Sequence, residues 1–172
     1  MSDQGKIGLF VPDDWTEYEL IDSGDGEKLE RFGAYTLIRP EPQAIWKPAL
    51  SRSEWEQVAN ARFDREQKDR YRFTDEVKGG WTRRNMPESW SIKYASKDFS
   101  LNLRLALTGF GHVGLFPEQG NNWNFISSAI RDARRNWPIR VLNLFAYTGA
   151  ASVVARMAGA EDPPGDLTAV RD

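Results

Sequence analysis

The stretch VLNLFAYTGAAS, residues 141–152, has the residue types best suited to hold an anionic group. A short apolar run ends at Thr148 and Gly149, and small residues that favour a helix follow. Where a strand passes through such a loop into a helix, backbone N–H groups point into the loop and the helix dipole favours an anion there. Gly149, Ala150 and Ala151 leave this concavity open. Close packing of the helix on the strand explains the same small residues equally well, so both interpretations stand.

Two familiar phosphate-binding motifs are missing from this stretch. A dinucleotide site prefers G-x-G-x-x-G, and a P-loop needs a lysine after its second glycine, but the sequence has only Gly149 followed by Ala150. The chain has one histidine, His112, and no cysteine, which argues against thiolate metal sites and against a Ser-His-Asp triad. We expect His112 to be a structural loop residue, and we expect no metal.

The composition is that of an ordinary protein with a hydrophobic core. The chain has 172 residues, of which 40% are hydrophobic, and a net charge of -2, which gives no overall attraction to nucleic acid. Residues 1–16 do not read as a signal peptide, and no apolar run approaches the ~20 residues of a membrane span. The absence of cysteine is compatible with the cytoplasm, where we expect the protein to be.

The elements around the candidate loop read as the opening of a doubly wound α/β sheet. Residues 139–145 predict a strand and 150–157 a helix, with Gly159 at its C-cap. A helix before this strand is expected from Asn121 or Asn122 to about 135, after a glycine-rich segment over 109–119. The residues from 161 to 172 have no apolar period and are expected to be disordered.

The N-terminal part predicts a separate α+β region. Strands are expected at 18–21 and 34–38, and residues 90–94 and 99–107 predict a β-hairpin because apolar and polar residues alternate in both. Ser51 and Glu54 form a capping-box pattern that predicts a helix to about residue 66. Residues 67–89 read as loop or irregular sheet.

Two motifs taken together resemble a known enzyme family. The sequence from Val141 to Gly149 resembles motif I of class I S-adenosylmethionine (SAM)-dependent methyltransferases, and most closely the N-x-F-x-Y-T-G form of the ribosomal-RNA large-subunit methyltransferase group. The segment from Gly114 to Gln119 resembles that group's second signature, G-x-F-x-D-Q, at a matching spacing. The pair covers residues 109–160, and residues 18–108 resemble the group more loosely.

The resemblance implies SAM as cofactor and a set of residues around it. The methionine part of the cofactor would lie against Phe145, Tyr147, Thr148 and Gly149, and Phe116 and Gln119 would border the same pocket. Phe116 and Phe145 could instead be core residues. The chain departs from the group at Glu118, where the group has aspartate, and at Gly120 and Trp123, where relatives often have arginine. No catalytic residue is identified.

The fold implied is α/β, with an α+β N-terminal region at 17–108, the truncated start of a Rossmann-like SAM-binding domain at 109–160, and a tail at 161–172. The function implied is SAM-dependent methylation of RNA, such as ribosomal RNA, by an enzyme of which this chain is an N-terminal fragment, inactive alone. The alternative is a non-catalytic RNA-binding or interaction module made from the N-terminal region.

Two groups of basic residues could meet RNA, although a solvated surface explains both. The first comprises Arg131, Arg134, Arg135 and Arg140. The second interleaves Arg70, Arg72, Arg83 and Arg84 with Tyr71, Phe73 and Trp81.

Overall fold

The computed structural model describes residues 15–65, 79–133, 138–144 and 146–161, and the chain divides into two compact units. The sheet unit comprises Trp15–Ala95 and Ser100–Leu115. The helical unit contains Ser96–Phe99 and the residues from Phe116 onward. The predicted tail and the aromatic-basic residues at 70–73 fall outside the described residues, apart from Glu161.

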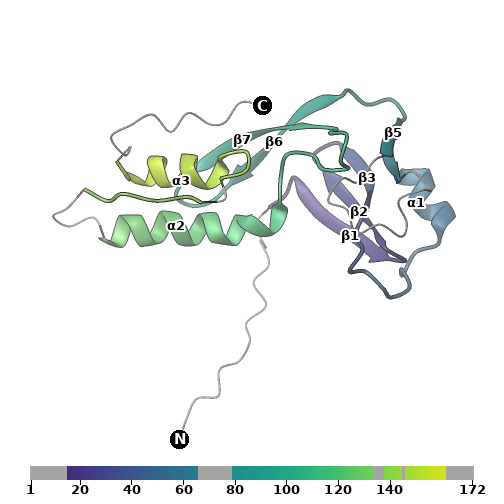
Figure 1. Cartoon of the computed structure of the whole chain (residues 1–172), viewed down its shortest axis with the longest axis horizontal. Coiled ribbons are helices and arrows are strands. Elements are labelled where there is room, and N and C mark those ends of the chain that lie inside the picture. Colours follow the sequence, from purple (N-terminus) through teal and green to yellow (C-terminus); the bar gives the residue numbers. More distant parts are fainter. Residues whose placement is uncertain (1–14, 66–78, 134–137, 145, 162–172) are drawn as a thin grey trace, which may run out of the picture. The chain divides into compact units, whose positions relative to one another are not determined.

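The sheet unit is built on a five-stranded sheet in the order β1-β2-β3-β4-β5 (Figure 1). Strands β1 (Tyr18–Gly24), β2 (Glu27–Phe32) and β3 (Tyr35–Pro40) form an antiparallel meander, and β4 (Ala61–Arg65) pairs in parallel with β3 and antiparallel with β5 (Gly79–Arg83). The two-residue turn between β1 and β2 has Asp25 and Gly26 at φ 51° and 79°. Positive φ at both central residues is what a type I′ hairpin turn requires.

Helix α1 (Arg52–Val58) begins where the capping box predicts it. The Ser51 side chain accepts a hydrogen bond from the Glu54 N–H, and the Glu54 carboxylate accepts one from the Ser51 N–H at 2.7 Å. Trp55 is buried against Leu29 and Ile38, so α1 covers one face of the meander.

The predicted extension of this helix to residue 66 is wrong. The helix ends at Val58, and Asn60 then binds β3: its Oδ1 accepts from the Thr36 N–H at 2.9 Å and its own N–H donates to the Thr36 carbonyl at 2.7 Å. This places Ala61 beside Leu37, and the following residues become β4. Phe63 is therefore buried from a strand and not from a helix, and its ring centre lies 5.4 Å from that of Trp81.

Asp22 fastens α1 to β1. Its carboxylate accepts hydrogen bonds from the Leu50 N–H at 2.8 Å, the Ala49 N–H at 3.2 Å and the Trp55 Nε1–H at 2.9 Å. Burial opposes ionisation of this carboxyl, but the hydrogen bonds together hold the pKa of Asp22 below its usual value. The ionised form is thus the one that the fold prefers.

A buried charged group lies on the other face of the meander. The Glu30 carboxylate is fully buried and accepts from Arg39 Nη2 at 2.6 Å, from Arg39 Nε at 2.7 Å and from the Tyr18 hydroxyl at 2.9 Å. Lys28 Nζ lies 3.5 Å from the same carboxylate. The four residues come from β1, β2 and β3, so one network joins three strands.

The predicted hairpin is confirmed as β6 (Ser89–Ala95) and β7 (Ser100–Ala106), paired in register from Ser89↔Ala106 to Ala95↔Ser100. Two tryptophans join it to the rest of the sheet unit. Trp90 Nε1 donates to the Phe32 carbonyl at 3.2 Å, and Trp15 Nε1 donates to the Lys93 carbonyl at 2.9 Å.

The helical unit contains α2 (Gly120–Ala133) and α3 (Ala150–Ala158), which pack on each other (Figure 1). The α2 N-terminus is continuous with a 3-10 turn at Pro117–Gln119, so the helix begins at Gly120 and not after an asparagine cap. Helix α3 ends at Gly159 in the left-handed conformation, φ 105°, as predicted.

Residues 139–145 were predicted as a strand, but the described residues 139–144 make only one ladder contact, a parallel bridge between Arg140 and Glu161. Ile139 and Val141 pack against the buried cluster of Ile130, Ala155 and Ala158, while Leu142 and Leu144 are 80% and 75% exposed. A parallel strand needs ladder partners on its flanks, and one bridge supplies too few. Arg140 precedes α3 and Glu161 follows it, so this bridge has the order of a β-α-β unit.

No helix in the described part of the chain is long and apolar enough to cross a membrane.

The first prediction concerns the buried carboxylate. Glu30→Gln leaves the Arg39 charge buried without its counter-ion, so we expect a loss of about 3 kcal/mol in the free energy of unfolding. The control is Glu19→Gln, because Glu19 pairs with Arg31 at 3.2 Å in a more exposed position, where loss of the pair costs less than about 1 kcal/mol. Urea unfolding of the three proteins compares them, and equal losses would contradict the assigned role.

The second prediction concerns pH. Because the folded-state pKa of Asp22 is lowered, its ionised carboxylate stabilises the fold above the unfolded pKa of about 3.8, and this contribution disappears as the pH falls through the folded-state value. Asp22→Asn should therefore lower the melting temperature at pH 7. The difference in melting temperature between the variant and the wild type should shrink progressively below about pH 4. A constant difference between pH 7 and the acid range would show that charge is not what Asp22 contributes.

Candidate functional site

The candidate loop lies at the start of α3, and its backbone is unusual. Gly149 is the N-cap residue with φ 88°, and Tyr147 also has positive φ, 51°. The Gly149 N–H donates to the Ala146 carbonyl at 2.7 Å, which closes a tight turn directly before the helix. A β-branched residue would strain the backbone at either position, and glycine adopts this conformation without cost.

Space is open beside Gly149. Apart from its chain neighbours and the backbone of α3, no heavy atom of a described residue lies within 4 Å of a Cβ atom placed on Gly149. An α-helix also leaves its first N–H groups without intrahelical acceptors, and in α3 the first intrahelical bond runs from the Val153 N–H to the Gly149 carbonyl. The geometry therefore fits a ligand that approaches the turn closely and accepts hydrogen bonds from the backbone.

Phe116 and Tyr147 meet at this turn, although they are 31 positions apart (147 − 116). Their ring centres are 4.7 Å apart with the planes tilted by 42°, and the side chains remain 37% and 54% exposed. This separation is at the short end of the range for favourable aromatic pairs. Phe116 is therefore not a buried core residue but part of a partly open aromatic surface beside the candidate loop.

The remaining predicted residues are placed as follows. Gln119 is exposed one turn after Phe116, where its N–H donates to the Phe116 carbonyl at 3.0 Å and its Oε1 accepts from Asn122 Nδ2 at 2.9 Å. Thr148 is exposed within the turn. Phe145 lies outside the described residues. The structure thus brings Phe116 and Tyr147 into contact and places Gln119, Thr148 and Gly149 on the segments that carry them.

One interaction in the site was not expected from the sequence. Asn143 Nδ2 donates to Ser152 Oγ at 3.0 Å, which ties the extended segment before the turn to the first turn of α3. The identity of Ser152 gave no signal of its own, because serine is common in helix first turns. We infer that this bond helps to fix the direction of α3 relative to the turn.

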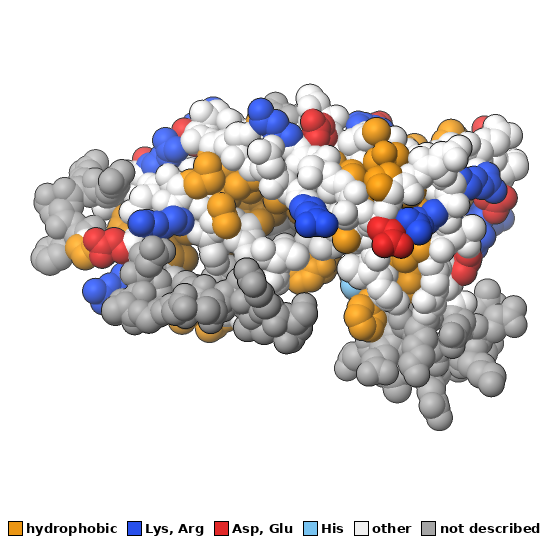
Figure 2. All heavy atoms as spheres, turned by 90° about the horizontal axis from the view of Figure 1, so that it is seen from above, with side chains coloured by type: hydrophobic (Ala, Val, Ile, Leu, Met, Phe, Trp, Pro, Cys, Tyr) orange, Lys and Arg blue, Asp and Glu red, His pale blue; other side chains and the backbone are white. Residues whose placement is uncertain are grey.

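The charged side chains that the structure describes do not form one basic surface. Charges of both signs are interspersed over the face seen in Figure 2. In the first basic group, Arg131 donates through Nη2 to the backbone carbonyl of Asp98 at 2.6 Å, and its Nη1 lies 3.5 Å from the Asp98 carboxylate. Arg140 is exposed, and Arg134 and Arg135 lie outside the described residues. No cluster of three or more metal-binding side chains was found within the described ranges.

The second basic group is split by the structure. Trp81 is half-buried: it packs on Phe63 and donates to the Thr108 carbonyl at 2.7 Å, so its ring is engaged within the sheet unit. Arg83 pairs with Glu88 at 3.1 Å, and Arg84 lines a cavity on the opposite face of the sheet. The backbone carbonyl of His112 accepts from Thr108, in keeping with a loop position.

Comparison with known proteins relates the chain to methyltransferases. No protein-family model matches it, and no curated protein matches it. Among solved structures, it is similar to the SAM-dependent methyltransferase from Agrobacterium tumefaciens, with a TM-score of 0.67 and 39% identity over 84% of this chain. A putative SAM-dependent methyltransferase from Streptococcus mutans aligns with 85% of the chain at 19% identity and a TM-score of 0.49. The chain spans 42% and 37% of the lengths of these two proteins, so it corresponds to part of a methyltransferase structure.

Proposed function

We propose that this chain forms part of the cofactor-binding region of a SAM-dependent methyltransferase that acts on RNA. The observation that carries the proposal is the 39% identity to the Agrobacterium methyltransferase, which extends over 84% of the chain and so includes most of both units. The turn before α3 supports it, because a left-handed glycine, an open space and a helix N-terminus coincide there.

The proposed cofactor contacts follow from the residues at the turn. Tyr147 and Phe116 offer partly exposed ring faces to the apolar part of a ligand, and a cation can be attracted to such a face. The open space at Gly149 lets the ligand reach the backbone of the turn. Bound SAM would supply a methyl group on a positively charged sulfur.

The part of these residues in catalysis would be to position the cofactor and exclude water. Methyl transfer depends on holding the two reacting atoms about 3–3.5 Å apart in line, and this arrangement lowers the barrier by removing the entropic cost of bringing them together. Aromatic side chains at the turn restrict the cofactor's orientation and keep water from it. The methyl acceptor is proposed to be RNA because the two motifs resemble the ribosomal-RNA methyltransferase group.

The third prediction tests the cofactor site with a matched pair of glycine variants. Asparagine tolerates the left-handed conformation better than other non-glycine residues, so Gly149→Asn should keep the turn while placing an amide in the open space. Gly159→Asn makes the same substitution at the other end of α3, also at positive φ. We expect binding of labelled SAM to weaken about tenfold or more in Gly149→Asn and to change little in Gly159→Asn.

Equal SAM binding by the two variants and the wild type would contradict the site. Equal weakening in both would show that the substitutions act through helix stability and not through contact with the cofactor. Circular dichroism at 222 nm on the same samples separates these outcomes, because a helix defect lowers the signal whereas a filled site does not.

The fourth prediction concerns the acceptor. Two proteins are compared: the chain alone, and the chain fused to the segment of the Agrobacterium protein that it does not cover. Each is supplied with labelled SAM and incubated with total RNA or with a protein extract. We expect label to enter RNA in the completed protein, and expect Gly149→Asn to reduce the transfer. Label in protein and not in RNA would support the methyltransferase and reject the RNA acceptor.

A further inference from the structure

The β6–β7 hairpin has two chemically different faces. Residues paired across a hairpin lie on the same face, and successive residues of each strand alternate between the faces. The apolar residues, from Trp90 to Tyr94 and from Leu101 to Leu105, therefore share one face, where they are buried or half-buried. The opposite face, which we call the hairpin face, carries Ser91, Lys93, Ala95, Ser100, Asn102 and Arg104.

The hairpin face carries positive charge and no acidic residue. All six of its side chains are exposed, and the pair at its open end, Ser89 and Ala106, is uncharged as well. Lys93 is paired with Asn102, two residues before Arg104 in β7, so the two cations are diagonal neighbours. The Cβ atoms of such neighbours lie roughly 7 Å apart, which leaves both charges free to meet one extended ligand.

The two cations are not neutralised by the protein. Neither Lys93 nor Arg104 makes an ion pair with any residue that the structure describes. Arg104 Nη2 donates to the Ser89 hydroxyl at 3.3 Å, a neutral acceptor that leaves the guanidinium charge unbalanced. Both side chains therefore keep their charge available for an anion from outside.

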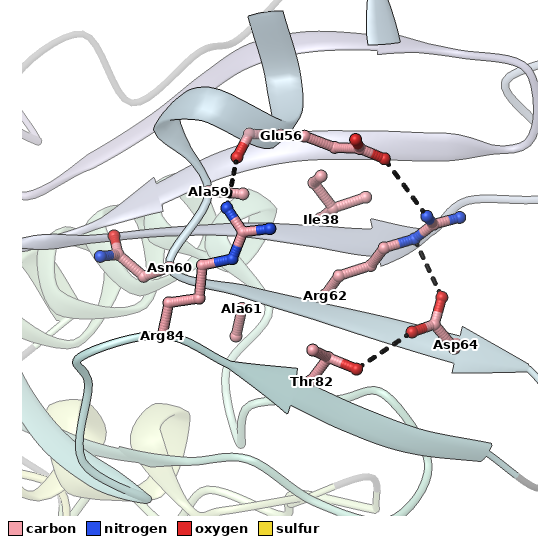
Figure 3. A pocket seen from close by; sticks show the side chains of 9 residues that line it. All are labelled: Ile38, Glu56, Ala59, Asn60, Ala61, Arg62, Asp64, Thr82 and Arg84. Atoms are coloured by element: carbon pink, nitrogen blue, oxygen red, sulfur yellow. Dashed lines mark hydrogen bonds and ion pairs between the residues drawn. The ribbon is translucent and has the colours of Figure 1, made fainter. Parts of the chain in front are cut away.

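Many other basic side chains of the sheet unit are engaged by acidic residues. A cavity beside α1, β4 and β5 shows this (Figure 3). At its rim Arg62 Nε lies 3.0 Å from Asp64 Oδ1, and Arg62 Nη1 lies 3.6 Å from Glu56 Oε1. Opposite charges this close cancel at a distance, so a further anion gains little there. The hairpin face is the better place for a phosphate.

The backbone at Lys93 is held firmly on the outer edge of β6. Its N–H donates to the Glu17 carboxylate at 2.6 Å, and its carbonyl accepts from Trp15 Nε1 at 2.9 Å. Glu17 binds this backbone and makes no ion pair with the Lys93 ammonium group within the described contacts. The cations thus project from a fixed support, so binding a ligand costs little backbone freedom.

The composition of the hairpin face fits the backbone of a nucleic acid. The core of a protein interface is apolar and aromatic, and this face has no apolar side chain larger than alanine. Unpaired bases stack on aromatic rings, which the face also lacks. Lysine, arginine, serine and asparagine side chains are donors that contact phosphate and sugar oxygens. Contacts to phosphate and ribose remain, and these do not depend on sequence.

We propose that the hairpin face binds the phosphate backbone of RNA, with Lys93 and Arg104 each pairing with one phosphate. Ser91 and Asn102 donate hydrogen bonds to phosphate or ribose oxygens of the same strand. The inference rests on the proposed function, since it names the surface that holds the proposed methyl acceptor. The hairpin face supplies affinity, and the choice of the methylated base belongs to other residues.

The test measures binding of a fluorescently labelled, unpaired oligoribonucleotide to the full chain by anisotropy at several salt concentrations. Lys93→Gln and Arg104→Gln remove one charge each, and a double variant removes both. Lys47→Gln is the matched control, because Lys47 is also exposed and without a described ion pair but lies in the loop before α1. Circular dichroism checks that each variant is folded, as expected for changes at exposed positions.

We expect each single variant to bind RNA about threefold or more weakly and to reduce the slope of log affinity against log salt by about 0.7, the value of one phosphate contact on a single strand. The double variant should reduce the slope by about 1.4. Lys47→Gln should bind within about twofold of wild type, because salt screens a charge far from the ligand. Equal weakening by Lys47→Gln, or a double variant that binds as well as wild type, would overturn the proposal. Polyglutamate that competes as well as unlabelled RNA would assign the face to acidic polypeptides instead.

The same samples separate this inference from the proposed function. SAM binding is measured on wild type and on the double variant, where we expect no difference because both residues lie outside the proposed cofactor turn. Unchanged RNA binding in the double variant, with SAM binding intact, would reject the hairpin face alone. RNA binding that falls in the double variant of a chain unable to bind SAM would support the hairpin face and reject the methyltransferase assignment, in favour of a non-catalytic RNA-binding module.

Discussion

The sheet unit depends on the buried Glu30 carboxylate. Removing a carboxylate from water is costly, and the cost is offset only where hydrogen-bond donors surround it. Here the donors come from Arg39 on β3 and Tyr18 on β1, with Lys28 nearby on β2 itself, so the network is satisfied only when the three strands pair in the observed register. A shift by one residue would move the carboxylate to the opposite face, away from these donors.

The register of the meander then positions everything that follows in this unit. Leu29 and Ile38 come together on the second face and receive Trp55 of α1, whose indole also donates to Asp22. The end of α1 brings Asn60 to Thr36, which sets β4 beside β3. The cavity forms where α1 ends over β4 and β5, so its shape follows from the buried network through a chain of packing contacts.

The helical unit follows a different constraint, the close packing of small residues. Ala155 and Ala158 of α3 pack with Ile130 of α2, and Ile139 and Val141 pack against this cluster. The left-handed residues at the two ends of α3, Gly149 and Gly159, fix where the helix begins and ends. The turn at the start of α3 is therefore held by the packing of the whole helix, while its own side chains, such as Tyr147, remain partly exposed. Exposure on a rigid support is the arrangement that a binding residue needs.

The sequence by itself determined the features that are encoded locally: the capping box at Ser51, the alternating hairpin of β6 and β7, and the glycine that ends α3. It also identified the motif at Gly149, because the residue types carry that signal. Tertiary structure alone decided that the helix after Ser51 stops at Val58, that Phe116 meets Tyr147, and that Arg83 and Arg84 lie on opposite faces. The reason is physical: a helix and a strand can share one apolar spacing, and only the hydrogen bonds and pairing offered by distant residues, such as Thr36 and Leu37 for the segment at Asn60, select between them.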